Sequence, residues 1–95
     1  MRYRMHLMSE GGPYIYRQDV LNAVWRHGIM PTERTTPELA RGFVRDLYKY
    51  EIRRLRERYL KNEFPKAEYS MLVEQLRNRY GVLALVPRQW VTEGR

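Results

Sequence analysis

The feature that most constrains the fold is an apolar pattern that continues at helical spacing across residues 39–59. Its members follow one another at steps of about three and four residues, which places them on one face of an α-helix. They are Leu39, Phe43, Val44, Leu47, Tyr48, Ile52, Leu55 and Tyr59. The repeat is close to a 3.5-residue period, which favours left-handed, coiled-coil-like packing against a second helix.

A capping sequence precedes this pattern. Either Thr35 or Thr36 can cap the helix, and Pro37 fits its first turn. Thr35 and Glu38 also have the spacing of a capping box. We therefore predict a helix over residues 36–61, which is longer than a small globule can cover.

A shorter pattern of the same kind follows a break at residues 62–65. Its apolar members are Tyr69, Leu72, Val73, Leu76 and Tyr80. Pro65 suits a first helical turn and Gly81 suits a C-terminal cap. We predict a helix over residues 65–80 that forms an antiparallel hairpin with the long helix.

A third amphipathic segment lies nearer the N-terminus. Its apolar stripe consists of Val20, Leu21, Val24 and Trp25. Gly28 stands where a left-handed C-terminal cap is expected, so we predict a helix over residues 16–27. His27 then suits the negative end of that helix's own dipole.

Both termini carry signals of extended structure. Residues 2–8 alternate between apolar and polar, and residues 82–87 are apolar with β-branched ends. Either segment could be a strand or an extended arm, and the two could pair. The sequence thus predicts a mainly α fold: a single domain over residues 1–95, with three helices and short extended segments at the ends.

Composition excludes several kinds of chemistry. The 95 residues include no cysteine, which excludes disulfides, iron–sulfur clusters and thiol catalysis. His6 and His27 lack the neighbouring ligands of a helical metal site, and no glycine-rich phosphate loop is present. We therefore expect no metal, no cofactor and no enzymatic activity, unless two copies assemble a site. No apolar run approaches a membrane span, and the N-terminus lacks the continuous apolar core of a secretory signal. We expect a soluble, cytoplasmic protein.

Charge provides the positive functional signal. There are 18 Lys+Arg against 11 Asp+Glu, a net charge of +7, which favours an acidic partner. Arginine greatly outnumbers lysine. This ratio fits bidentate recognition of phosphate or carboxylate, and it also fits a GC-rich genome. Genome composition does not explain the net charge.

The cations concentrate on the predicted long helix. One set falls within an arc of about 120°, largely opposite the apolar stripe. We name it the cationic stripe; its members are Arg41, Arg45, Lys49, Arg53 and Arg56. A row of cations one turn apart is suited to a phosphate backbone or an acidic protein.

Two functions follow as hypotheses. The first is a non-catalytic helical protein-interaction module that forms a homo-oligomer or joins a larger assembly, because the long amphipathic helix offers more apolar surface than one small core uses. The alternative is a nucleic-acid-binding protein that uses the cationic stripe on the phosphate backbone.

Overall fold

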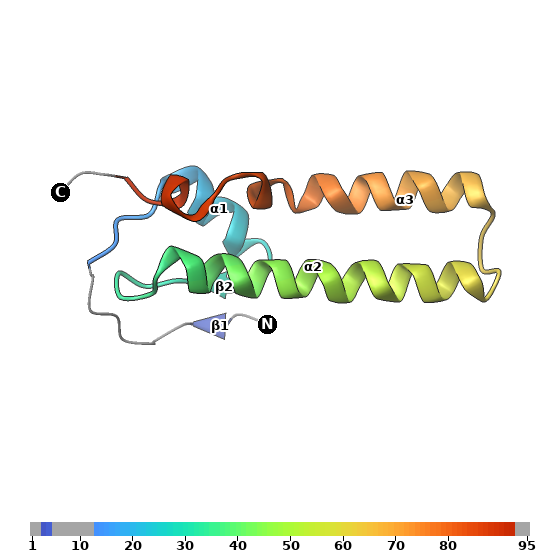
Figure 1. Ribbon diagram of the computed structural model, residues 1–95, viewed down its shortest axis with the longest axis horizontal. Helices are drawn as coiled ribbons and strands as arrows, with labels where there is room; N and C mark the ends of the chain where they lie inside the picture. Colours follow the sequence, from blue (N-terminus) through green and yellow to red (C-terminus); the bar gives the residue numbers. More distant parts are fainter. Residues whose placement is uncertain (1–2, 5–12, 93–95) are drawn as a thin grey trace.

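Three helices dominate the computed structural model, which describes residues 3–4 and 13–92. They are α1 (Gln18–Trp25), α2 (Pro37–Leu60) and α3 (Lys66–Arg79). Helices α2 and α3 form an antiparallel hairpin, and α1 lies beside one end of it (Figure 1). The predicted mainly α fold with a long central helix in a hairpin is confirmed.

Short elements complete the end of the molecule that holds α1. Strands β1 (Tyr3–Arg4) and β2 (Ile29–Met30) pair in parallel, which gives the connector before α2 a short strand. After α3 come two 3₁₀ turns, η1 (Gly81–Ala84) and η2 (Pro87–Trp90), and both contact α2.

Residues 82–87 differ from the prediction of an extended segment. Most of them belong to the two 3₁₀ turns, and only Leu85 and Val86 between the turns are extended. Pro87 has no amide hydrogen to donate to a strand ladder and its φ suits the first position of a turn. The tail therefore folds back over the helices in turns.

The predicted pairing between the two termini is also wrong for the described residues. Strand β1, all that the structure describes of residues 2–8, pairs with β2. The C-terminal segment instead forms an antiparallel bridge between Val91 and Tyr16, and the amide of Thr92 donates to the carbonyl oxygen of Ile15.

The start of α2 depends on Thr36. Its Oγ1 accepts a hydrogen bond from the amide of Leu39 at 3.1 Å, so Thr36 is the N-cap and Pro37 opens the helix. Thr35 has a different role: its buried Oγ1 accepts from the amide of Thr32. The capping box expected from Thr35 and Glu38 therefore does not form.

The end of α2 is set by Asn62. Its φ of 62° is left-handed, a conformation that asparagine tolerates better than most residues. The amide of Glu63 donates to the carbonyl oxygen of Arg58, and the amide of Asn62 donates to that of Tyr59. These two bonds form a Schellman motif, which closes the helix and turns the chain toward α3.

A glycine ends α1, but the glycine predicted to end α3 does not. Gly28 has φ 81° and closes the turn after α1, as predicted. Gly81 does not cap α3; Tyr80 is the C-cap there, and Gly81 begins η1.

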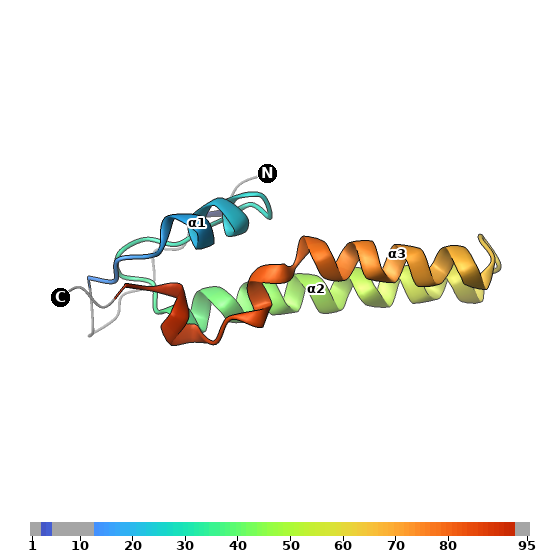
Figure 2. The same ribbon diagram turned by 90° about the horizontal axis from the view of Figure 1, so that it is seen from above.

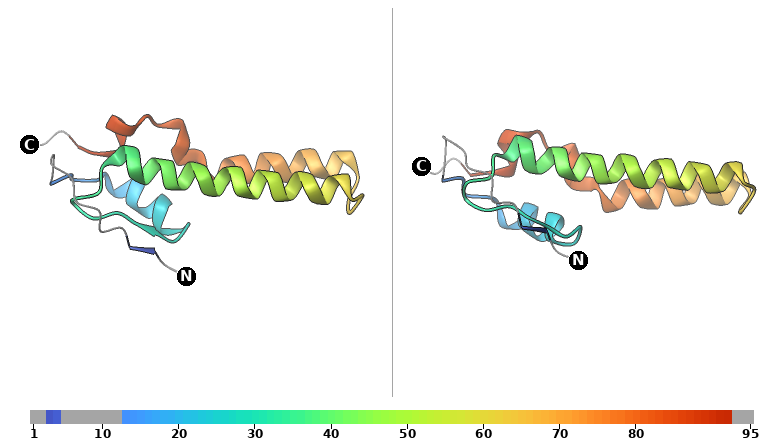
Figure 3. Two further views of the ribbon diagram at one scale, coloured as in Figure 1. Left: turned by 60° about the horizontal axis from the view of Figure 1, so that its bottom comes forward. Right: turned by 90° about the horizontal axis from the view of Figure 1, so that it is seen from below.

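The buried side chains occupy a head and a narrower stalk. We define the head as α1, β2, η1, η2 and the start of α2, and the stalk as the hairpin over residues 47–79. Figures 2 and 3 show that α1 and the tail cover only the head end, and the molecule measures 50 × 20 × 18 Å. Buried apolar residues of the head are Val20, Val24, Ile29, Ala40, Val44 and Trp90, together with Tyr16 just before α1. Buried stalk residues are Leu55, Phe64 and Leu76, and Tyr80 is buried between the stalk and η1.

Stacked aromatic rings join the two helices near the turn. The rings of Tyr59 and Tyr69 lie 4.3 Å apart and nearly parallel. This contact confirms that α2 and α3 meet as the sequence predicts. Because the stalk is only two helices thick, parts of its apolar surface stay accessible.

Candidate interaction surfaces of the helical hairpin

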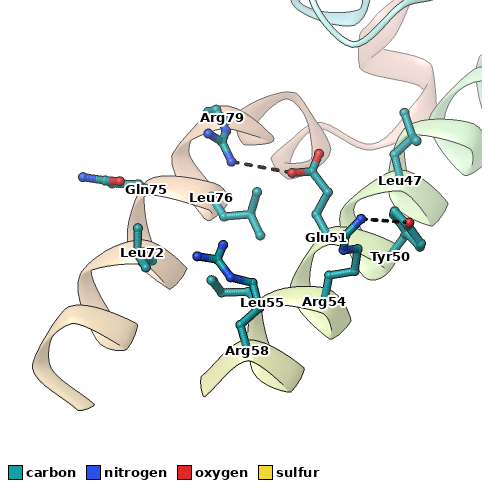
Figure 4. Close-up of a pocket in the computed structure, with 10 residues that line it drawn as sticks. All are labelled: Leu47, Tyr50, Glu51, Arg54, Leu55, Arg58, Leu72, Gln75, Leu76 and Arg79. Atoms are coloured by element: carbon teal, nitrogen blue, oxygen red, sulfur yellow. Dashed lines mark hydrogen bonds and ion pairs between the residues drawn. The ribbon is translucent and has the colours of Figure 1, made fainter. Parts of the chain in front are cut away.

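One side of the stalk carries an open groove of about 540 Å³ between α2 and α3. Figure 4 shows its lining. Leucines from both helices form the floor: Leu47, Leu55, Leu72 and Leu76. The rim is polar and consists of Tyr50, Glu51, Arg54, Arg58, Gln75 and Arg79. We refer to this feature as the stalk groove.

The floor of the stalk groove contains both buried and partly accessible leucines. Leu76 is 2% exposed and Leu55 is buried, so both belong to the helix–helix core. Leu47 and Leu72 are half-buried and present apolar surface to the groove. In a three-helix layer another helix would cover such positions, but α1 lies at the head end of the hairpin (Figure 2).

Arginine dominates the charge of the groove. Arg54 donates to the hydroxyl of Tyr50 at 3.3 Å and lies over its ring, and this hydrogen bond raises the pKa of the Arg54 guanidinium above its usual range. Arg58 donates to Glu63 at 2.7 Å and covers the ring of Phe64. Together with Arg79 on α3, three arginines therefore line the groove. We refer to Arg54, Arg58 and Arg79 as the groove arginines.

Glu51 is the acidic residue of the lining, and it is already engaged. Its carboxylate lies 3.6 Å from the guanidinium of Arg79 and accepts a hydrogen bond from the hydroxyl of Tyr80. Burial raises the pKa of the Tyr80 phenol, and the bond to Glu51 raises it further. The groove thus retains an excess of positive charge.

The hollow surface continues beyond Glu51 toward the end of α1. Two further depressions, of about 430 and 650 Å³, share Glu51 with the stalk groove. Their other lining residues include Trp25, Arg26, His27 and Asn78. Trp25, predicted to pack inward, remains 39% exposed beside this surface.

The cationic stripe is not a single surface. Arg41 is half-buried and donates to the carbonyl oxygens of Leu83 and Leu85 at 2.6 and 2.9 Å. Arg41 therefore anchors the C-terminal tail to α2, so part of its hydrogen-bonding capacity is already used within the chain.

The other four stripe residues are exposed on α2. Arg45 lies 3.9 Å from Asp46, whereas the side chains of Lys49, Arg53 and Arg56 form no hydrogen bond or ion pair with another described residue. On an ideal helix this row lies roughly 160° round from Arg54 and Arg58. Helix α2 therefore carries cations on two opposite flanks.

Ion pairs differ from those expected from helical spacing. Helical spacing would allow the pairs Glu38–Arg41, Asp46–Lys49 and Glu57–Lys61, and none of them forms in the described part of the chain. The pairs observed are Arg17–Asp19, Arg45–Asp46, Arg58–Glu63 and Arg79–Glu51. The side chains of Lys49 and Lys61 consequently stay less neutralised than helical spacing suggests.

None of the groove arginines was among the binding residues predicted from the sequence. Arg54 and Arg58 were available as a signal, because on the helical wheel they lie on either side of Leu47 and away from the cationic stripe. Arg79 joins them only through the register of the hairpin, which brings it beside Glu51.

Among residues 3–4 and 13–92, no group of three or more His, Cys, Asp or Glu is placed to hold a metal ion. Nor does any helix in that part combine the length and apolar character needed to cross a membrane. No protein-family model matches the chain, and no characterised protein or solved structure matches it.

Proposed function

We propose that this chain is a non-catalytic helical interaction module whose partner binds in the stalk groove. The observation that carries the proposal is the combination of an accessible leucine floor with arginines on the rim. Apolar surface that a two-helix layer leaves open is what a partner can bury, and each leucine covered contributes roughly 1–2 kcal/mol.

The position of the groove supports this function. The head already holds one end of the hairpin, so a partner on the stalk would not compete with α1 or the tail for their contacts (Figure 3). Polar groups at the rim and apolar groups at the centre also match the usual anatomy of a protein interface.

Site-specific cross-linking in the native host tests this function without knowledge of the partner. A photoreactive residue replaces Gln75, which lines the groove, and in a control chain it replaces Glu74, an exposed neighbour that does not line it. We expect discrete adducts at position 75 that are absent at position 74. A product of twice the chain mass would identify a second copy, the predicted homo-oligomer. Equal adducts at both positions, or none at either, would argue against the proposal.

A second candidate function is nucleic-acid binding through the exposed part of the cationic stripe. It is favoured by the lack of any observed acidic partner for Lys49, Arg53 and Arg56 among the described residues. Cations one turn apart on an exposed helix can contact successive phosphates, and such binding weakens steeply with salt.

Charge reversal separates this candidate from general attraction. Changing both Arg45 and Arg53 to Glu should weaken binding to a short duplex more than changing Arg2 and Arg88 to Glu, although both variants lose the same charge. Filter binding over a range of salt concentrations measures the difference. Equal losses would indicate only non-specific charge.

A further inference from the structure

We propose that the partner in the stalk groove is an acidic amphipathic α-helix of another protein. Its apolar side chains would lie on the leucine floor and its carboxylates against the groove arginines. This proposal rests on the interaction function proposed above and specifies the chemistry of the partner.

The groove has the length of a short helix. Its lining on α2 runs from Leu47 to Arg58, a distance of about 17 Å at 1.5 Å per residue. On the other side Leu72 and Leu76 stand one turn apart on α3. A helix of about 12 residues with apolar groups at i, i+3, i+4 and i+7 spans this floor and meets a leucine at each turn.

The groove arginines have hydrogen-bonding capacity to spare. A guanidinium carries five N–H donors. Arg54 uses one of them on the Tyr50 hydroxyl, and Arg58 uses its Nε on Glu63. The remaining donors can bind carboxylates in a bidentate manner, and the carboxylate of Glu51 is directed toward Tyr80 and Arg79 instead of toward Arg54 or Arg58.

This charge favours an acidic protein over two other occupants. A second copy bound about a two-fold axis would bring two grooves of net positive charge together, which is unfavourable. A nucleic acid would neutralise Arg54 and Arg58 but would leave Leu47 and Leu72 without apolar cover. An acidic amphipathic helix satisfies both the rim and the floor.

The two depressions beyond Glu51 also favour an acidic partner. Arg26 lines both of them and adds a cation near the end of α1. A partner helix longer than the stalk groove therefore meets positive charge at that end as well.

Designed peptides test this inference on the full chain. The first is a fluorescent peptide of about 12 residues with leucines at i, i+3, i+4 and i+7 and glutamates beside them. The second has every glutamate replaced by lysine. Fluorescence anisotropy should show that the acidic peptide binds about ten-fold more tightly than the basic one, and that added salt reduces the difference.

Matched variants locate the site. Arg54→Glu should weaken the acidic peptide about five-fold and strengthen the basic one. Arg56→Glu is the control, because Arg56 is equally exposed on α2 but lies about 160° away round the helix; it should change affinity by less than about two-fold. Leu72→Ala should weaken the acidic peptide about five-fold, and circular dichroism verifies that each variant is folded.

The outcomes separate this inference from the proposed function. If Arg54→Glu and Arg56→Glu weaken binding equally, the acidic helix is not in the groove and the inference fails. The inference also fails if a single-stranded oligonucleotide displaces the acidic peptide from the wild type but not from Arg54→Glu, because the groove would then bind nucleic acid. It fails as well if the chain sediments as a dimer that Leu72→Ala dissociates, because the groove would then bind a second copy. If neither peptide binds while position 75 still cross-links, the acidic-helix inference fails and the interaction function stands. If position 75 does not cross-link either, both fail.

Discussion

The imidazole of His27 stacks on the phenol ring of Tyr80, with the ring centroids 4.1 Å apart and the planes 20° from parallel. The Nε2 atom of His27 lies 3.0 Å from the carbonyl oxygen of Arg79. Because a carbonyl oxygen only accepts, Nε2 carries the hydrogen. His27 therefore interacts with the negative end of α3, whereas the sequence assigned it to the end of α1.

Replacing His27 tests this connection between head and stalk. His27→Leu removes both the ring stacking and the hydrogen bond, so the free energy of unfolding should fall by about 1–2 kcal/mol. Urea denaturation measures the change. Gln18→Ala, which removes an exposed bond within α1, should cost less than about 0.5 kcal/mol. If the two changes lowered the free energy of unfolding equally, His27 would not connect the head to the stalk.

Arg41 is expected to be the cation on α2 that matters most for stability. Arg41→Ala removes two charge-assisted hydrogen bonds to the tail and should cost about 2–3 kcal/mol. Thermal unfolding can be monitored by tryptophan fluorescence, because buried Trp90 comes shortly after Leu83 and Leu85, the tail residues that Arg41 contacts. Arg45→Ala is the comparison and should change stability by less than about 0.5 kcal/mol. A silent Arg41→Ala would mean that other contacts hold the tail.

The two neighbouring threonines before α2 should respond differently. Thr36→Ala removes the N-cap of α2 and should lower the free energy of unfolding by about 1 kcal/mol, while Thr36→Ser should restore most of it. Thr35→Val keeps the shape of the side chain but leaves the amide of Thr32 without its acceptor, which should cost about 1–3 kcal/mol. Chemical denaturation of the three variants checks the assignment, and a neutral Thr36→Ala would contradict it.

Alkaline pH should destabilise the fold through two tyrosines. Burial raises the pKa of Tyr16 and of Tyr80 above the usual value of about 10. A group whose folded pKa is raised contributes stability that is fully present below its unfolded pKa and is lost as the pH rises toward the folded pKa. The free energy of unfolding should therefore fall progressively above about pH 10.

An absorbance titration of the phenolates tests this expectation. The chain contains eight tyrosines, and Tyr16 and Tyr80 should ionise after others. Tyr80→Phe should remove part of the late phase and reduce the loss of stability at high pH. Ionisation of every tyrosine near pH 10, with the fold intact, would refute the prediction.

The helical hairpin was predictable because local patterns determine it. The apolar stripe, Pro37 and the break near Pro65 place α2 and α3 within one residue of their observed ends. The ends themselves were less predictable. Asn62 supplies the left-handed residue that ends α2. Gly81 was the expected cap of α3, but it does not adopt a positive φ.

The tail and the site depended on tertiary contacts that periodicity does not contain. Residues 82–87 read as extended because they are apolar and β-branched, but the carbonyl groups of Leu83 and Leu85 turn toward Arg41. That interaction joins residues distant in sequence and removes Arg41 from the cationic stripe. The groove required the register of two helices, which the sequence of either helix alone does not give.

The head holds the hairpin at one end only, and this sets an order for local unfolding. Amide groups in the turn around Asn62 have few layers of protein between them and water, so they should exchange with deuterium sooner than those near Val44. A ligand lying along the stalk would slow exchange there and leave the head nearly unchanged. The end of the stalk farthest from the head is thus the region where local unfolding begins. It is also where binding of a ligand to the stalk groove can be detected most directly.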